Sequence, residues 1–217
     1  MKSLSMHRAV IISGFLTNLS DNIIPFLNKE TDLYVHTWDT YENRRWIKKL
    51  ERYKHHCNYF ESIIEQPSSY EKLLSYFYST YKAYSLVSDD CKEVIKFKPN
   101  IDTDYIPYIG NIDRYFHKAK IQCRPLLDTT SITDCVFGKV YYKTIDERIF
   151  SGTKLAFDKI FPILDSNIMT EAEKLNAALK QKYVEDYEGS IFWTEWLNRK
   201  GIKIIEDTDL IITNNKI

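Results

Sequence analysis

Oxygen-bearing side chains alternate along a short polar segment that directly follows a hydrophobic stretch near the middle of the chain. Asn100, Asp102 and Asp104 occupy this segment, and the apolar residues before it end at Phe97. Oxygen ligands two residues apart at the end of a strand can face one divalent cation, which can hold a diphosphate at the same time. The spacing therefore predicts a Mn²⁺ or Mg²⁺ site at Asn100, Asp102 and Asp104, with a solvated acidic turn as the simpler alternative.

Several familiar motifs for phosphate binding and nucleophilic catalysis are absent from the sequence. No G-x-G-x-x-G follows the first hydrophobic run, and neither G-x-x-x-x-G-K-[ST] nor G-x-S-x-G occurs anywhere. The sequence therefore argues against a dinucleotide-binding dehydrogenase, a P-loop nucleotidase and a serine hydrolase.

Hydrophobic periodicity predicts alternating strands and helices, and these elements must position the polar segment. We expect strands at 8–13, 32–36, 58–64, 93–98, 121–127, 132–137, 202–205 and 210–212, and helices at 18–28, 41–56, 68–87, 152–164, 170–184 and 190–200. This order predicts a single α/β domain over residues 1–217, with three α/β/α layers around a mixed, mainly parallel central sheet. Ligands bind beyond the carboxyl ends of the strands in such sheets, so we expect a site at 14–18, 36–39 and 98–104.

Residues typical of helix ends mark three of these boundaries. Ser68 with Glu71, and Thr170 with Glu173, have the spacing of capping boxes and predict two helix starts. Gly201 is expected to end the last helix in the left-handed conformation.

Composition excludes several classes of partner. The chain has 217 residues, with 30 Lys and Arg against 30 Asp and Glu, and a zero net charge does not suit a nucleic-acid-binding surface. No stretch approaches the ~20 apolar residues of a membrane span, and we interpret the apolar run at 9–16 as a buried strand rather than a signal peptide.

The four cysteines are widely spaced, as in a soluble cytoplasmic protein with reduced thiols: Cys57, Cys91, Cys123 and Cys135.

Five short motifs, spread over most of the chain, are shared with one group of proteins. They are IISGFL at 11–16, YVHTWD at 34–39, VIKFKPN at 94–100, DERIFSG at 146–152, and EWL at 195–197 followed by GIKI at 201–204. In these motifs and in its order of elements, the sequence resembles a family of small sugar transferases of bacterial polysaccharide clusters and large DNA viruses, which have the glycosyltransferase-A fold.

The resemblance implies a nucleotide-sugar site formed at three strand ends. Gly14 would let the backbone approach the nucleotide, His36 would contact the base or a phosphate, and Lys98 would steady the diphosphate. Trp38 would flank the nucleotide, and Asp39 would meet the ribose or base. Structural roles in turns and in the core are the alternatives. The full set of candidates is Gly14, Phe15, Leu16, His36, Trp38, Asp39, Lys98 and Asn100.

The resemblance also implies catalytic carboxylates and shows two departures from the family pattern. Asp146, Glu147 and Glu195 are candidates for binding acceptor hydroxyls or taking a hydroxyl proton, and the alternative for Asp146 is to cap the helix that this stretch is expected to open. Lys98 stands where arginine is usual and lacks its bidentate fork. Asn100 stands where aspartate is usual, so a metal ligand is expected at Asp102 or Asp104.

Together these features predict a glycosyltransferase that moves a sugar from a nucleoside-diphosphate sugar to a hydroxyl of a glycan or glycoprotein, with Mn²⁺ or Mg²⁺. The resemblance places it in the cytoplasm of a bacterium or of a virus-infected host cell. One alternative is another nucleotide-dependent transferase, such as a nucleotidyltransferase. Another is a non-catalytic carbohydrate-binding or assembly protein on a transferase scaffold.

Overall fold

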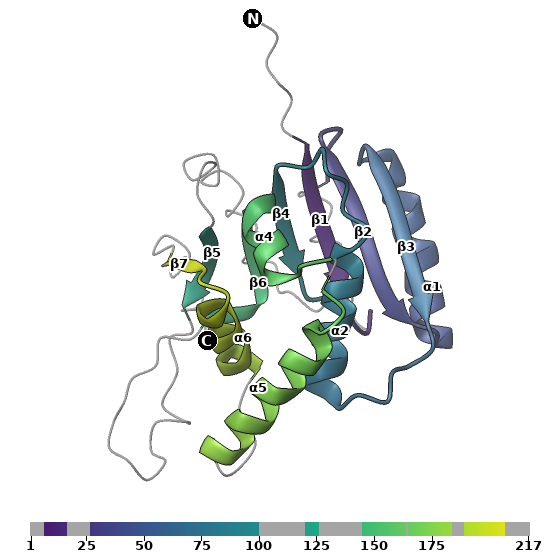
Figure 1. Cartoon of the computed structure of the whole chain (residues 1–217). Coiled ribbons are helices and arrows are strands. Elements are labelled where there is room, and N and C mark those ends of the chain that lie inside the picture. The colour runs from purple at the N-terminus through teal and green to yellow at the C-terminus, as the bar shows by residue number, and fades with distance from the viewer. Residues whose placement is uncertain are drawn as a thin grey trace, which may run out of the picture.

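The computed structural model describes residues 7–16, 27–99, 120–125, 145–163, 165–183 and 189–206 (Figure 1). Its strands are β1 (Arg8–Ser13), β2 (Thr31–Trp38), β3 (Tyr59–Glu65), β4 (Glu93–Phe97), β5 (Lys120–Pro125), β6 (Ile145–Thr153) and β7 (Lys203–Glu206). Its helices are α1 (Tyr41–Glu51), the 3₁₀ helix η2 (Arg52–His55), α2 (Lys72–Tyr84), α4 (Lys154–Ile160), α5 (Ile168–Tyr183) and α6 (Gly189–Arg199).

The strands form one seven-stranded sheet in the order β3-β2-β1-β4-β6-β5-β7. The four strands β3, β2, β1 and β4 run parallel, β6 runs antiparallel to both of its neighbours, and β7 runs parallel to β5. The prediction of a mixed, mainly parallel sheet is therefore confirmed.

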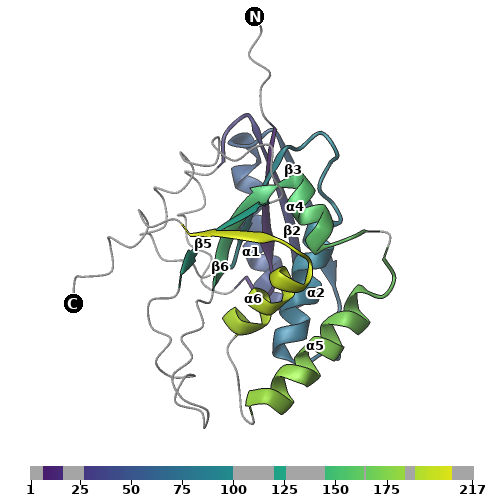
Figure 2. The ribbon, with the colours of Figure 1, turned by 60° about the vertical axis from the view of Figure 1, so that its left-hand side comes forward.

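Each face of the sheet carries its own buried core. Side chains of successive strand residues point to opposite faces, so Val10 and Ile12 pack with Ile47 of α1, while Ala9 and Ile11 pack on the α2, α4, α5 and α6 side with Phe77. Figures 1 and 2 show α1 on one side of the sheet and the other helices on the opposite side. The predicted three α/β/α layers are confirmed.

The first residues of the motif at 146–152 belong to a strand and not to the beginning of a helix. Asp146 and Glu147 lie in β6, and α4 begins only after Thr153, whose Oγ1 accepts a hydrogen bond from the Ala156 amide at 3.2 Å. The suggestion that Asp146 caps a helix is therefore wrong. Pairing explains this, because β6 pairs with β4 from Ile149 onward and with β5 as far back as Ile145, which precedes Asp146.

Both predicted capping boxes are also wrong. Glu71 itself is the N-cap of α2 and makes no capping bond with its side chain, and the Ser68 hydroxyl donates instead to the Ser75 hydroxyl at 3.1 Å. Helix α5 begins at Ile168, which places Thr170 inside it. Gly201 does adopt the left-handed conformation, with φ of 65°.

Two further expectations concern membranes and thiols. None of the helices in the described ranges is long and apolar enough to cross a membrane. Cys57 and Cys91 are free and buried in the structure. The predicted strands at 132–137 and 210–212 lie outside the described residues, as does nearly all of the helix expected at 18–28.

Candidate functional site

A cleft of about 1060 Å³ lies at the carboxyl ends of β1, β2 and β4. One wall comes from these strand ends and the other from the beginning of α2 together with α5. The lining residues at the strand ends are Ser13, Gly14, Phe15, Trp38, Lys98 and Pro99. The cleft therefore lies where the three predicted segments meet, at the edge of the sheet where ligands bind in this class of fold.

The turn after β1 depends on Gly14. Its φ is +95°, and a Cβ atom at this position would lie 3.2 Å from Cδ2 of Tyr76. Its amide donates to the Ser79 hydroxyl at 2.7 Å and to the His36 carbonyl at 3.2 Å, and its carbonyl accepts from the Thr37 hydroxyl at 2.8 Å. The glycine thus lines the cleft with a bare backbone whose amide and carbonyl are already bonded inside the protein.

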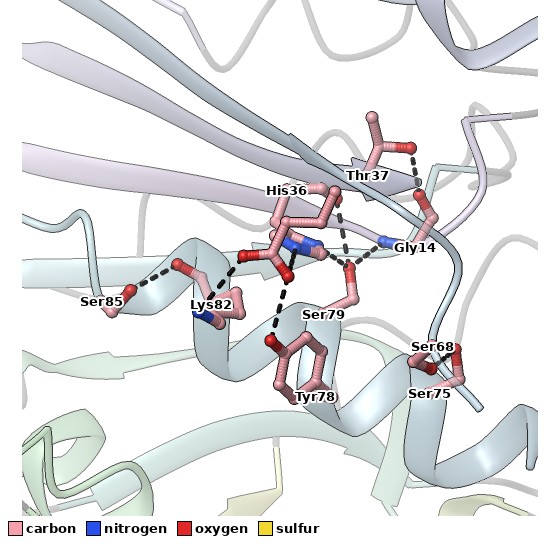
Figure 3. A network of polar contacts seen from close by, with 10 residues as sticks. Gly14, His36, Thr37, Ser68, Ser75, Tyr78, Ser79, Lys82 and Ser85 are labelled. Carbon is pink, nitrogen blue, oxygen red and sulfur yellow. Dashed lines mark hydrogen bonds and ion pairs between the residues drawn. The ribbon is translucent and has the colours of Figure 1, made fainter. Parts of the chain in front are cut away.

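The Ser79 hydroxyl on α2 joins the ends of β1 and β2 (Figure 3). Besides Gly14, it contacts Nδ1 of His36 at 2.8 Å and donates to the His36 carbonyl at 3.2 Å. Next to it, the hydroxyls of Ser13 and Thr80 lie 2.8 Å apart. A row of small hydroxyl side chains on α2 therefore holds the strand ends in place beneath the cleft.

His36 lies under the cleft and not among its lining residues. Its side chain is fully buried, its ring stands edge-on to Trp38 at 5.1 Å, and its Nε2 is 3.4 Å from Oε2 of Glu65. Burial lowers the pKa of His36, although the nearby Glu65 carboxylate acts in the opposite direction. The structure thus brings His36 to the site as a buried partner of Ser79.

Glu65, at the end of β3, is the partly exposed member of this network. It accepts from the Tyr78 hydroxyl at 3.0 Å and pairs with Nζ of Lys82 at 3.2 Å. Partial burial would raise the pKa of Glu65, but the hydrogen bonds from Tyr78 and Lys82 and the charge of His36 outweigh it, and the pKa is lowered. The carboxylate is therefore kept ionised next to the buried imidazole.

Trp38 and Asp39 have different surroundings. Trp38 is 1% exposed, lines the cleft and stacks on Tyr78 with ring centroids 5.9 Å apart. Asp39 is not one of the described lining residues; Arg44 holds its two oxygens at 2.5 and 2.8 Å, and Gln66 adds a third bond at 3.2 Å. The hydrogen bonds from Arg44 also lower the pKa of Asp39.

Two further predicted residues come from the segment after β1. Phe15 is 53% exposed and lines the cleft, whereas Leu16 is fully buried. The Leu16 amide donates to Oδ1 of the buried Asn43 at 2.9 Å, and Nδ2 of Asn43 donates to the Trp38 carbonyl at 2.8 Å. One asparagine on α1 therefore ties the ends of β1 and β2 together from the side opposite to Ser79.

Lysines give the cleft a positive character. Nζ of Lys98 lies 5.1 Å from the Tyr76 ring, and Nζ of the fully buried Lys96 lies 4.5 Å from the same ring. The described lining residues include three lysines, Lys72, Lys98 and Lys180, and one carboxylate, that of Glu71. The cleft therefore suits a ligand with negative charge.

Glu71 was expected only to cap a helix, yet it stands in the cleft wall. Its carboxylate accepts hydrogen bonds from Nδ2 of Asn176 and from Nζ of Lys180, both on α5. The three side chains join the beginning of α2 to α5 across one side of the cleft. No local sequence pattern connects these residues, because more than a hundred positions separate Glu71 from its two partners.

The other predicted site residues are not among the lining residues that the structure describes. Asn100, Asp102 and Asp104 lie outside the described residues. Asp146 and Glu147 lie at the end of β6 that adjoins the carboxyl end of β4, because Phe97 pairs with Ile149 in antiparallel register, so the sheet brings them toward Lys98.

Glu195 is half-buried on α6 and is not one of the lining residues that the structure describes. Within the described ranges, no group of three or more His, Cys, Asp or Glu side chains is placed to hold a metal ion.

Comparison with solved structures gives distant matches. The glycosyltransferase GlyE of Streptococcus pneumoniae TIGR4 matches over 94% of this chain and 45% of its own, at 10% identity and a TM-score of 0.49. Mouse xyloside xylosyltransferase 1 matches over 92% of this chain and 84% of its own, at 10% identity and a TM-score of 0.47.

A third match is 4-diphosphocytidyl-2C-methyl-D-erythritol synthase of Anaerococcus prevotii DSM 20548, over 95% of this chain and 90% of its own, at 9% identity and a TM-score of 0.43. The chain thus spans less than half the length of GlyE. No family model matches the sequence, and no curated protein sequence does. Likeness at this level concerns the fold alone, so what the chain does has to be inferred from its own cleft.

Proposed function

We propose that this chain is a nucleotide-sugar-dependent glycosyltransferase that moves a sugar from a nucleoside-diphosphate sugar to a hydroxyl of a glycan or glycoprotein. One observation carries the proposal: the cleft at the carboxyl ends of β1, β2 and β4 has the Gly14 turn on one strand end and Lys98 on another. Nucleotides bind at this position in open α/β sheets.

The lining charges support a diphosphate as the anionic part of the ligand. Glu71 is paired with Lys180, and the three lysines against this one carboxylate give the described lining residues a net positive charge. The Tyr76 ring lies next to both Gly14 and Lys98. A phosphate packed against the Gly14 turn, whose amide and carbonyl are bonded inside the protein, would therefore lie close to the Lys98 ammonium, which would stabilise the charge of the leaving diphosphate.

A divalent cation fits the segment that follows Lys98. Carboxylate and amide oxygens are the ligands that Mg²⁺ and Mn²⁺ prefer. Asn100, Asp102 and Asp104 supply three of them directly after Pro99, a lining residue. A cation held there would add Lewis-acid stabilisation of the leaving diphosphate.

The acceptor would need a group that takes its hydroxyl proton. Asp146 or Glu147 is proposed for this role, because both precede Ile149 on β6, which pairs with Phe97 at the carboxyl end of β4. As the bond from the sugar C1 to the diphosphate breaks, a bond from C1 to the acceptor oxygen forms and the proton passes to the carboxylate.

A binding experiment tests the proposal. Thermal unfolding is measured with UDP, GDP, dTDP and CMP, each with and without Mn²⁺. A ligand at about 100 times its Kd should add ~2.7 kcal/mol to the free energy of unfolding. We expect one nucleoside diphosphate to stabilise the chain, and Asp102→Ala and Asp104→Ala to remove the part of this effect that requires Mn²⁺. Absence of stabilisation by every nucleotide would contradict the proposal and favour a non-catalytic carbohydrate-binding protein.

A further inference from the structure

The cleft has a second half whose chemistry differs from that of the strand ends. Its volume of about 1060 Å³ slightly exceeds the ~300–1,000 Å³ typical of a site for one small molecule. The strand-end half holds Gly14 and Lys98. The helical half is lined by residues of α5, of α2 and of the segment before α2: Pro67, Ser68, Tyr70, Glu71, Lys72, Leu73, Ser75, Asn176 and Lys180. There is thus room for a second ligand beside a nucleotide.

We propose that the helical half is the subsite for the acceptor sugar, with Glu71 as its main hydrogen-bond acceptor; this inference rests on the proposed glycosyltransferase function. Lys180 and Asn176 hold the Glu71 carboxylate in one place. Asn176 is 6% exposed, so the anchor on the α5 side is fixed in the core.

The hydrogen-bonding groups of the helical half suit a ligand with many hydroxyls. The Lys180 ammonium compensates Glu71, whose side chain is 40% exposed and still reachable. A carboxylate has about four lone-pair positions, so two protein donors leave others for ligand hydroxyls. Ser68 and Ser75 add hydroxyl groups to the same wall, and the half-buried Tyr70 ring adds an apolar surface against which a sugar face can pack.

Glu71 is poorly placed to serve the diphosphate itself. It precedes Tyr76 by five positions along α2, a distance of about 7.5 Å at the helical rise, and Tyr76 marks the level of Gly14 and Lys98. A carboxylate would also repel phosphate oxygens. The two halves of the cleft are therefore suited to two different substrates.

The test compares Glu71→Gln with Glu171→Gln. Both variants remove a carboxylate that pairs with a lysine, but Glu171 pairs with Lys200 at 2.7 Å between α5 and α6, and neither residue is a lining residue of the cleft. Binding of the methyl glycosides of glucose, galactose, mannose, xylose and N-acetylglucosamine is titrated by ligand-observed NMR. Affinity for the stabilising nucleoside diphosphate is measured in parallel.

We expect at least one glycoside to bind the wild type and Glu171→Gln equally, and to bind Glu71→Gln about tenfold or more weakly, the loss typical of a hydrogen bond to a charged group. Nucleotide affinity should stay within about twofold in both variants. If Glu71→Gln unfolds more easily than its control, Glu71→Asp keeps the charge, withdraws the carboxylate by one methylene, and should also weaken glycoside binding.

Three results would overturn the acceptor subsite: no glycoside in the panel binds, binding is unchanged in Glu71→Gln, or nucleotide affinity falls in parallel with glycoside affinity. The wild-type chain could instead bind no nucleotide but bind a glycoside through Glu71. This result would contradict the transferase and still support a sugar site at this position.

Discussion

The amide of Gly14 and the hydroxyl of Ser79 lie 2.7 Å apart, although 65 residues separate them in the chain. This bond fixes the turn after β1 to the middle of α2. Because Ser79 also contacts the His36 ring, the ends of β1 and β2 and helix α2 form one rigid base beneath the cleft (Figure 3). The geometry of the proposed nucleotide site thus depends on buried groups that no ligand would touch.

Gly14→Ala should impair both stability and nucleotide binding. Its φ of +95° and the 3.2 Å approach of Tyr76 together predict a loss of about 1–3 kcal/mol in the free energy of unfolding, measured with urea. Gly201→Ala is the matched control, because Gly201 also has a positive φ, of +65°, but a Cβ there would meet no atom within 4 Å. The control should lose about 1–2 kcal/mol and keep full nucleotide affinity. Equal nucleotide affinity in both variants would contradict a nucleotide at the Gly14 turn.

Ser79→Ala should destabilise the chain by about 1–3 kcal/mol, because it leaves the buried Gly14 amide with a weaker partner and the His36 ring without its hydroxyl contact. Ser85→Ala lies near the end of the same helix and removes only a local bond to the Lys82 carbonyl. Its cost should be about 0.5 kcal/mol or less. Similar urea midpoints for the two variants would show that the network contributes little.

Stability should fall as the pH is lowered from about 7, and His36 should contribute to this fall. Burial lowers the pKa of His36 below its usual 6.5, so the unfolded chain binds the proton more readily than the folded one. The contribution of His36 is complete above about 6.5 and is lost as the pH drops toward the folded-state pKa. Glu65, whose pKa is also lowered, adds a second loss below about 4.5.

Urea unfolding between pH 5 and 8 measures this dependence. His36→Gln should flatten the curve between about pH 5 and 7, whereas His56→Gln, which replaces an exposed histidine, should keep the wild-type profile. Parallel curves for wild type and His36→Gln would show that His36 does not bind its proton more weakly in the folded chain.

Lys98→Met should weaken binding of the nucleoside diphosphate about 10- to 100-fold, the range for losing a charged hydrogen bond to a phosphate. Lys49→Met is the control, because Nζ of Lys49 also lies over an aromatic ring, 4.9 Å from that of Trp46, but on α1 and away from the cleft lining. Calorimetric titration of both variants gives the two affinities. An equal Kd for both variants would show that Lys98 does not bind the nucleoside diphosphate.

Much of the fold could be predicted because its signals are local. The strand at 8–13 was expected with the bounds that β1 has, since a β-branched run between a polar start and a glycine is readable within six residues. The strand ends that line the cleft followed from the order of elements, because parallel strands bring their carboxyl ends to one edge.

Residues whose roles come from distant contacts could not be predicted. Asn43 occupies an apolar-stripe position on α1, with Ile47 and Leu50, and only the approach of Leu16 and Trp38 explains its polarity. The strand β6 contains Asp146 and Glu147, which favour turns and helix starts, and its two neighbours in the sheet override that preference. Polar residues on the buried faces of α1 and α2 were the signal available in the sequence.

The most direct test of the transferase is the chemistry of its product. The chain is incubated with UDP-, GDP-, dTDP- and CMP-sugars, Mn²⁺ and the panel of methyl glycosides as acceptors, and the released phosphorus species are identified by ³¹P NMR. We predict release of a nucleoside diphosphate from one donor class, strongly reduced in Lys98→Met and unchanged in Lys49→Met. No release from any donor, or release of a nucleoside monophosphate together with a sugar phosphate, would contradict the glycosyltransferase.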